Sequence, residues 1–481
     1  MKVLLVANPM TVMGFDRMVR LPNLGLNSIA ANIDKRMFEV KIVDLVLAGK
    51  NPREYYKNLL VDYQPDIVGL SCMSFQYQEA LALARLTKMY NKNSTVVIGG
   101  YHPTVDYETI LESKDMDVID FLVRNEGEVT FDRLTKALKS GDDLRTIPNL
   151  SYRANGDTIH NLSGGLVNLD ELKRPNRDAR ILKKGFKLFG YPADVIEMTR
   201  GCVFDCNFCS ITKMYGKSLR KYPIQRIIED IKDVIDRGAK AIMLADDNTT
   251  IDGKHLKKIC EAIIDAGLNK VKYYVQANIK GIKHTPGLAE IMVKAGCKWI
   301  FLGLESGSEQ TLAFYDKKNQ FDIPEAFEVV KELKSHGAFI FGGMIIGNPD
   351  DTEETIWASY TYAKNLGVDV PIFGILTPYP NTPLRDILIQ QGLVTNLYDY
   401  SKYTGFEANV KTNYLSSEQL YHLREELGSR YPVDSGAIWR VLREFSTFLP
   451  KVVLTEFVRD PMEILVYLKG ILSRGITVKS Q

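Results

Sequence analysis

The chain has 481 residues, which is enough for two or three domains rather than one core. With 61 Lys and Arg against 59 Asp and Glu, and no basic stripe, its charge argues against nucleic acid as a partner. No run of about eighteen apolar residues predicts a membrane span, "MKVLLVANPM" is too short for a signal sequence, and six cysteines, three of them clustered, favour the cytoplasm.

Residues 1–141 alternate short β-rich runs with helical patterns. Val- and Ile-rich strands separated by helices predict a parallel sheet covered on both faces, which is a doubly wound, Rossmann-like α/β domain. The five predicted strands are 2–7, 39–44, 66–71, 95–100 and 120–125. Residues 142–190 are expected to form a linker that begins with a turn-rich, hairpin-like stretch.

A second strand-helix series occupies residues 191–385 and predicts a partial, TIM-like (β/α)6 barrel. Its predicted strands are 194–199, 241–246, 272–277, 299–304, 338–346 and 370–376. Residues 386–481 form a mainly helical C-terminal domain in this interpretation. A predicted helix at 460–475 has an apolar side that either packs on the barrel or brings the protein to a lipid substrate.

Three cysteines stand at the end of the first barrel strand, in "TRGCVFDCNFCSI" (199–211). The other five strands also end in polar stretches, and barrel enzymes place their chemistry at these ends. Thiolates bind iron–sulfur clusters and zinc, and three ligands leave one iron of a 4Fe–4S cube open. The alternative is a zinc site completed by a distant His or Cys, although Cys260 and Cys297 fall within helical patterns away from the strand ends.

The stretch "CVFDCNFC" resembles the CxxxCxxC motif of the radical S-adenosylmethionine enzymes. The resemblance implies that Cys202, Cys206 and Cys209 hold a 4Fe–4S cluster whose open iron binds S-adenosylmethionine. It places Phe208 near the adenine, and it places Glu305 and Ser306 near the methionine or the ribose. The remaining expected contacts, taken from the ends of strands two, three and five, are Asp246, Gln276, Ile345 and Gly347.

The first domain lacks a GxGxxG after its first strand, which argues against a dinucleotide. Its "GGYHPT" (99–104) and "NEGE" (125–128) resemble the cobalamin-binding domain of one class of these enzymes. "DLVLAG" (44–49) stands where DxHxxG would supply a cobalt-ligating His, so the resemblance implies base-off, His-off cobalamin. His102 is expected near the corrin edge or the nucleotide tail, or as an ordinary turn residue. The other expected cobalamin contacts are Met73, Ser74, Phe75, Gln76, Gly99, Gly100, Thr104 and Glu126.

The resemblance therefore implies a methyltransferase that uses methylcobalamin and a 5′-deoxyadenosyl radical to methylate an unactivated sp³ carbon. The cofactors carry the chemistry, so no protein side chain is assigned a catalytic role. The expected substrate is a peptide or protein side chain, for example in methyl-coenzyme M reductase, and a hopanoid, another lipid or a natural product is the rival. A low-potential donor of the ferredoxin or flavodoxin type is the expected partner. A non-methylating cyclase or ring-rearranging enzyme, and a cobalamin or iron–sulfur carrier without catalysis, remain alternatives.

Overall fold

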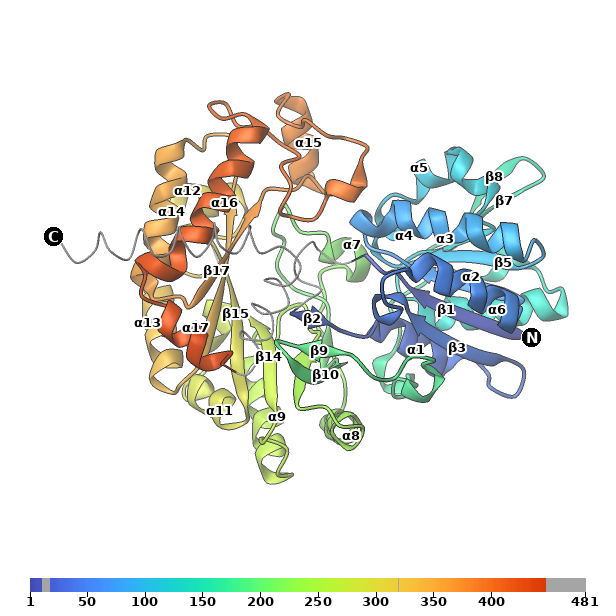
Figure 1. Ribbon diagram of the computed structural model, residues 1–481, viewed down its shortest axis with the longest axis horizontal. Helices are drawn as coiled ribbons and strands as arrows, with labels where there is room; N and C mark the ends of the chain where they lie inside the picture. Colours follow the sequence, from blue (N-terminus) through green and yellow to red (C-terminus); the bar gives the residue numbers. More distant parts are fainter. Residues whose placement is uncertain (11–17, 319, 447–481) are drawn as a thin grey trace.

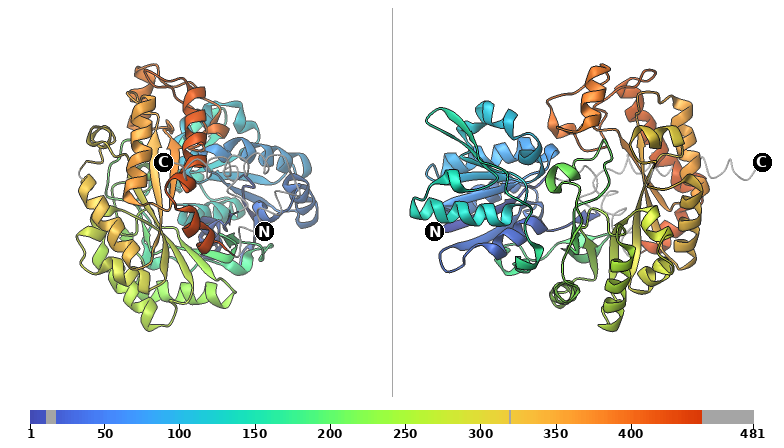
Figure 2. Two further views of the ribbon diagram at one scale, coloured as in Figure 1. Left: turned by 60° about the vertical axis from the view of Figure 1, so that its left-hand side comes forward. Right: turned by 180° about the vertical axis from the view of Figure 1, so that it is seen from behind.

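The computed structural model describes residues 1–10, 18–318 and 320–446. Two sheets lie side by side, each in its own domain (Figure 1), and the views in Figure 2 show the same separation from two other directions. Within these described ranges, no helix is long and apolar enough to cross a membrane. The predicted helix at 460–475 lies outside the described residues.

The first domain is built on a seven-stranded sheet in the order β3-β1-β4-β5-β6-β7-β8. Its first five strands are parallel, as predicted, and are β1 (Lys2–Ala7), β3 (Glu39–Asp44), β4 (Ile67–Ser71), β5 (Thr95–Gly99) and β6 (Phe121–Val123). The helices are α1 (Leu24–Asn32), α2 (Pro52–Tyr63), α3 (Tyr77–Tyr90), α4 (Tyr101–Val105), α5 (Tyr107–Glu112) and α6 (Gly127–Ser140), with the short helix η2 (Ser74–Gln76).

Alternation along the strands explains why both faces of this sheet are covered. In β1, Val3 and Leu5 pack into the core under α1 and α6, whereas Leu4 and Val6 pack into the core under α2 and α3. Successive side chains of a strand point to opposite faces, so apolar residues at every position require helices on both sides.

The hairpin-like stretch at the start of the predicted linker belongs to the first sheet. Its strands β7 (Leu150–Ala154) and β8 (Asp157–His160) extend the sheet from β6 with antiparallel pairing. The chain then runs to the second domain through irregular structure and the short helices η5 (Leu169–Glu171) and η6 (Arg177–Ala179).

The second sheet has the order β17-β16-β15-β14-β13-β10-β9-β2 and six parallel strands, which form a curled partial barrel (Figure 1). The parallel strands are β10 (Tyr191–Ile196), β13 (Ala241–Leu244), β14 (Lys272–Ala277), β15 (Cys297–Glu305), β16 (Phe339–Ile346) and β17 (Val370–Ile375). The helices are α7 (Ile211–Tyr215), α8 (Ile224–Asp236), α9 (Gly253–Asp265), α10 (Ile279–Lys283), α11 (Leu288–Lys294), α12 (Glu309–Phe314), α13 (Ile323–Ser335) and α14 (Glu353–Leu366).

The barrel strands also alternate, and this alternation positions the site. Trp299 and Phe341 pack in an aromatic cluster with Phe189 on the concave side, while Ile300 and Ile340 pack against the outer helices. The Trp299 and Phe341 rings lie near the amino ends of their strands. The cluster therefore fills that end, and the carboxyl ends are left to form a cavity.

Two short pairings connect the parts. β2 (Val19–Arg20), from the N-terminal region, pairs with β9 (Lys187–Leu188) at the edge of the second sheet. β11 (Thr199–Arg200) pairs with β12 (Arg220–Lys221) and closes the base of the cysteine loop. After β17 the described chain contains α15 (Pro383–Gln390), η7 (Tyr400–Lys402), α16 (Ser417–Asp434) and α17 (Ile438–Glu444), in line with the predicted helical character.

Candidate active site

The three cysteines line one cavity of about 210 Å³ at the carboxyl ends of the barrel strands. The loops after β10, β13, β14 and β15 all contribute to its wall, as expected for a barrel active face. Predicted residues that reach this cavity are Cys202, Cys206, Cys209, Phe208, Gln276 and Glu305. The Phe208 ring stands edge-on to Tyr315, with their centroids 5.2 Å apart.

The thiols fit a cluster better than a single metal ion. Among the described residues, no three His, Cys, Asp or Glu side chains converge on a point where one metal ion could bind. A single zinc would need such convergence, with sulfurs about 2.3 Å from the ion. Burial raises the pKa of all three thiols, that of Cys209 to about 12, so a bound metal is needed to hold them as thiolates.

After β13, the side chain that lines the cavity is that of Asp247, whereas the sequence predicted Asp246. Asp246 is fully buried, and its carboxylate accepts hydrogen bonds from the Met198 N–H, 3.2 Å away, the Thr199 N–H and the Thr199 hydroxyl, 2.7 Å away. Burial raises its pKa to about 7. Asp246 therefore anchors the backbone that leads to the cysteine loop. Its neighbour Asp247 lines the cavity and accepts from the Gly201 N–H at 3.0 Å.

Glu305 carries a partner that the sequence did not indicate. Its φ is 56°, and its carboxylate forms a buried ion pair with Lys317, whose ammonium also donates to the Gly303 carbonyl at 2.9 Å. Lys317 and Gln320 both line the cavity, and the Gln320 amide lies 2.9 Å from the sulfur of Cys206. A buried lysine beside polar side chains suits the carboxylate of an amino-acid-like ligand.

Besides Asp246, three predicted contacts do not reach this cavity. Ser306 is buried and its hydroxyl caps the next turn by accepting from the Ser308 N–H. Ile345 packs against the outer core. The Gly347 N–H donates to Asp351 at 2.8 Å, and the space at its Cα is closed by Leu420. The loops after β13, β14 and β15 reach the cavity and the loop after β16 does not, and strand-end position alone did not determine which side chain of a loop turns inward.

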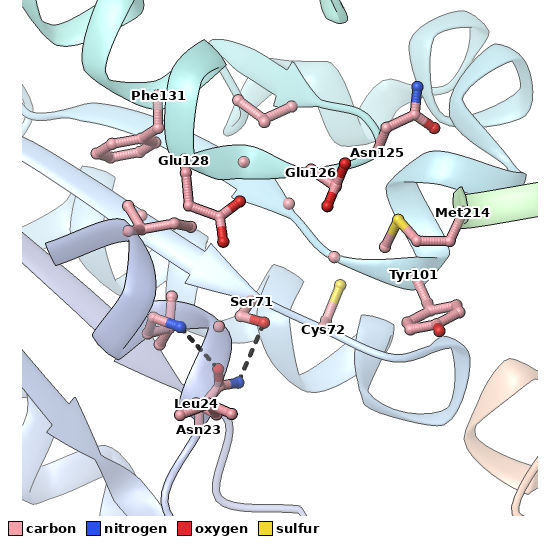
Figure 3. Close-up of a pocket in the computed structure, with 18 of the residues that line it drawn as sticks. Asn23, Leu24, Ser71, Cys72, Tyr101, Asn125, Glu126, Glu128, Phe131 and Met214 are labelled. Carbon is pink, nitrogen blue, oxygen red and sulfur yellow. Dashed lines mark hydrogen bonds between the residues drawn. The ribbon is translucent and has the colours of Figure 1, made fainter. Parts of the chain in front are cut away.

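A second cavity, of about 290 Å³, enters the first domain between its sheet and helices α1 and α6 (Figure 3). Gly69 helps to open it, because a Cβ there would lie 2.8 Å from Leu5 and 3.1 Å from Phe131. At its outer end lie Tyr101, Glu126 and Met214, at the junction of the two domains (Figure 3). A deep, largely apolar cavity with a polar mouth suits the buried tail of a large ligand.

Five of the predicted cobalamin contacts line this second cavity: Met73, Gln76, Gly99, Gly100 and Glu126. Ser74 and Phe75 do not. Ser74 turns away from it, with its hydroxyl 3.3 Å from Nδ1 of His102. Thr104 instead joins two loops, because its hydroxyl donates to the Gly100 carbonyl at 2.7 Å and accepts from the Asn125 N–H at 2.8 Å.

His102 faces away from the cavity. Its ring is fully buried between Tyr77 and Tyr400, with centroid distances of 4.4 and 4.7 Å. Burial lowers its pKa to about 3. Nε2 lies 3.8 Å from an oxygen of Asp106, which is too far for a hydrogen bond, so burial dominates and the ring is neutral. His102 therefore does not line this cavity, and its ring packs the first domain against η7.

Gly99 and Gly100, at the end of β5, differ in how closely other parts of the chain approach them. Gly100 has a φ of 106°, and a Cβ there would lie 2.8 Å from the carbonyl oxygen of Cys72. At Gly99 the nearest atom, the Val123 carbonyl oxygen, would be 3.4 Å away. Gly100 thus allows the chain's own loops after β4 and β5 to touch at the mouth of the second cavity.

Helix α7 forms part of the wall between the two cavities and lies between the domains in Figure 1. Ile211, at its start, lines the cysteine cavity, and Met214 and Tyr215, at its end, line the second cavity. Arg200 and Glu197 of the barrel also line the second cavity, beside Glu126 and Glu128 of the first domain. Sequence reasoning missed this junction, because the residues that meet there are 70 or more positions apart.

The chain matches two families in the order expected. Residues 10–135 match the B12 binding domain, and residues 196–363 match the radical SAM superfamily. It is 33% identical over 427 residues to an uncharacterized methyltransferase of Pyrococcus horikoshii, covering 88% of this chain and 90% of the relative. It is 26% identical to the hopanoid C-3 methylase of Methylococcus capsulatus, covering 79% and 71% of the two chains.

The fold is also found in a solved structure. The radical S-adenosylmethionine methyltransferase TsrM of Kitasatospora setae, with cobalamin and a [4Fe-4S] cluster bound, superposes with a TM-score of 0.67. The match covers 81% of this chain and 78% of that one, at 17% sequence identity. At this identity the likeness concerns the fold.

Proposed function

Because the chain belongs to the cobalamin-dependent radical S-adenosylmethionine enzymes of the methyltransferase type, we propose that it transfers a methyl group to an unactivated sp³ carbon. The observation that carries this proposal is a pair of cavities, one lined by three half-buried cysteines and one with an apolar interior that suits a cofactor tail, with helix α7 between them. When bound, the cofactors supply hydrogen-atom abstraction and the methyl group, and the protein supplies their placement.

The residues present fit these cofactors. Cys202, Cys206 and Cys209 would hold a 4Fe–4S cluster and leave one iron open. The polar residues around the same cavity would hold S-adenosylmethionine, with Lys317 toward its carboxylate and Phe208 as an aromatic wall. The second cavity would hold the tail of cobalamin, and no histidine is among the residues that line it. We therefore propose that cobalamin binds without a histidine ligand.

The protein's own contribution is exclusion of water and fixed geometry. Tyr101 and Tyr215 line the second cavity at the junction, and desolvation raises the pKa of both phenols, so they are neutral. No proton has to be moved by a side chain, because hydrogen leaves the substrate as an atom.

For the substrate we propose a carbon on a peptide or protein side chain, with methyl-coenzyme M reductase as one candidate. The support is the modest cover over the barrel mouth: between β17 and α16 the described chain has only α15, η7 and connecting turns. A low-potential donor of the ferredoxin or flavodoxin type would supply the electron. The hopanoid C-3 methylase among the relatives keeps a lipid substrate as the rival.

A comparison of a deletion strain with its parent tests the substrate class. We expect one peptide in the deletion strain to be lighter by one methylene, restored by the wild-type gene but not by a gene in which Cys202, Cys206 and Cys209 are Ala. A methylene difference confined to a lipid or a small metabolite would contradict the peptide substrate and leave the methyltransferase assignment in place. No difference in any fraction would contradict both.

A further inference from the structure

The base of the cysteine loop is held by the other domain. Residues 201–219, which carry the three cysteines and α7, leave and re-enter the barrel through the two-stranded pair β11–β12. Arg200 and Arg220 stand opposite each other in this pair. We call this two-stranded base, residues 199–200 and 220–221, the neck of the cysteine loop.

All three nitrogens of the Arg200 guanidinium donate hydrogen bonds to carboxylates. Nη1 donates to Glu126 at 2.8 Å, Nη2 donates to Glu128 at 2.7 Å, and Nε donates to Glu197 at 2.8 Å. Glu126 and Glu128 belong to the first domain, and the Arg200 side chain is only 7% exposed. Charge-assisted hydrogen bonds with this fork geometry fix orientation as well as distance.

Other residues extend this network to the second strand of the neck and to helix α1 of the first domain. Arg220 donates to both oxygens of Glu126 at 3.0 Å. Glu128 accepts from the Ser28 hydroxyl of α1 at 2.7 Å, so the network reaches the helix that roofs the second cavity. The neck is therefore clamped to the β6–α6 turn and to α1, and these two elements form the wall of that cavity.

Arg200, Glu126, Glu128 and Glu197 also line the second cavity itself. Cys202 follows Arg200 by two residues. The backbone at Gly201, between them, packs closely against the other side of the loop, because a Cβ there would lie 2.4 Å from the Ser218 carbonyl oxygen. The same carboxylates thus face the proposed cobalamin site and fix the start of the cluster loop.

We propose that Arg200 is a positioning residue that couples the two cofactor sites, so that filling the cluster site tightens cobalamin binding and the reverse. The proposal rests on the proposed function. A cluster holds residues 202–209 in place and with them Arg200, which then holds Glu126 and Glu128 in the arrangement that shapes the cobalamin cavity. Coupling between two sites is reciprocal, and coupling of this kind commonly changes affinity about 5- to 150-fold.

The test is the dissociation constant of hydroxocobalamin, measured by anaerobic spectral titration of the full chain with and without the reconstituted cluster. For the wild type we expect the cluster to tighten binding by about fivefold or more. In Arg200→Lys, which keeps the charge but cannot serve three carboxylates, the ratio should fall to about one. Glu126→Gln, which is isosteric, should lower the ratio as well and decides the matter if the Arg200 variant does not fold.

Arg180→Lys is the matched control. Arg180 is also a buried arginine between the domains, bonded to Asp194 at 2.6 Å and Asn27 at 2.8 Å, but it lines neither cavity. It should keep the wild-type ratio. A wild-type ratio of one, an unchanged ratio in Arg200→Lys or Glu126→Gln, or an equal loss in Arg180→Lys would overturn the coupling role. A wild type that binds neither cofactor would instead refute the proposed function and the coupling with it.

Discussion

The three thiols are neutral in the free protein, because burial disfavours their charged form. They become ligands only when a metal replaces the proton, so the cluster is expected to depend on all three. None of the three cysteines lines the second cavity, whose barrel lining consists of Glu197, Arg200, Met214, Tyr215 and Ala245.

Changing Cys202, Cys206 and Cys209 together to Ala should abolish the visible absorption of the reconstituted cluster and leave hydroxocobalamin binding detectable. Absorption spectra of the two titrations give both results. Cys260→Ala, a buried core cysteine on α9, is the control and should keep both signals. Loss of cobalamin binding as complete as that of the cluster would contradict the separation of the two sites.

His102 makes a prediction about pH. Its pKa is lowered to about 3 from 6.5 by burial, so below pH 6.5 the unfolded state binds a proton that the folded state does not. Protonation of His102 in the unfolded state therefore does not lower the free energy of unfolding above pH 6.5, and it lowers this free energy progressively as the pH falls from 6.5 toward 3. Between pH 6.5 and about pH 5 this group alone accounts for a loss of about 2 kcal/mol.

His102→Phe keeps a ring between Tyr77 and Tyr400 but does not titrate. Its melting temperature should fall less than that of the wild type when the pH is lowered from 6.5 to about 5. His422→Gln, at a histidine with a 70% exposed side chain, should follow the wild type. Equal pH sensitivity in His102→Phe and the wild type would show that His102 is not buried as a neutral ring.

At the scale of single residues, the sequence predicted types of chemistry better than orientations. The cysteine spacing brought out three residues that do line one cavity, because the motif is local. Asp246 and Asp247 follow β13 directly, and their places depend on contacts about 46 residues away: Asp246 accepts from Thr199, and Asp247 accepts from Gly201. His102 could not be placed either, because its neighbour Tyr400 is almost 300 residues away.

Among the elements, the turn from β5 into α4 is the most constrained part of the second cavity. Gly100 has a positive φ and touches the Cys72 backbone, so any side chain there would push apart the loops after β4 and β5. Both loops line the cavity, through Met73 and Gln76 on one side and Tyr101 on the other.

Gly100→Ala should lower the melting temperature and weaken hydroxocobalamin binding, because backbone strain of about 1–3 kcal/mol is added to a steric clash. Gly141→Ala is the control: Gly141 has a φ of 82° and no atom would lie within 4 Å of an added Cβ, so only the backbone strain applies. Titration and thermal melting of both variants separate the two effects. Equal cobalamin affinity in both variants would contradict the role given to the turn.

The elements themselves were predictable wherever hydrophobic periodicity is strong. The strands at 2–7, 39–44 and 272–277 lie where they were expected, because each is an uninterrupted β-rich run. The first barrel strand ends three residues earlier than predicted, at Ile196, because the carboxylate of Asp246 captures the Met198 and Thr199 N–H groups. The hairpin at 150–160 was recognised as a hairpin, but its pairing with β6 is a long-range contact that no local pattern encodes.

For the whole molecule, the order of the domains followed from the sequence, whereas their junction did not. The wall between the cavities combines α7, Tyr101 of α4 and the carboxylates around Arg200, and its members come from both domains. The proposed cofactor sites would thus lie next to each other, with residues of the short helix α7 in the lining of both cavities.

The most direct test of the methyltransferase assignment is the pair of products made from S-adenosylmethionine. Anaerobically reconstituted protein, loaded with hydroxocobalamin and given a strong low-potential reductant and an extract of the deletion strain, should form S-adenosylhomocysteine and 5′-deoxyadenosine together, as measured by mass spectrometry. 5′-Deoxyadenosine without S-adenosylhomocysteine would indicate a non-methylating radical enzyme, and the absence of both products would indicate a carrier; either result would contradict the account.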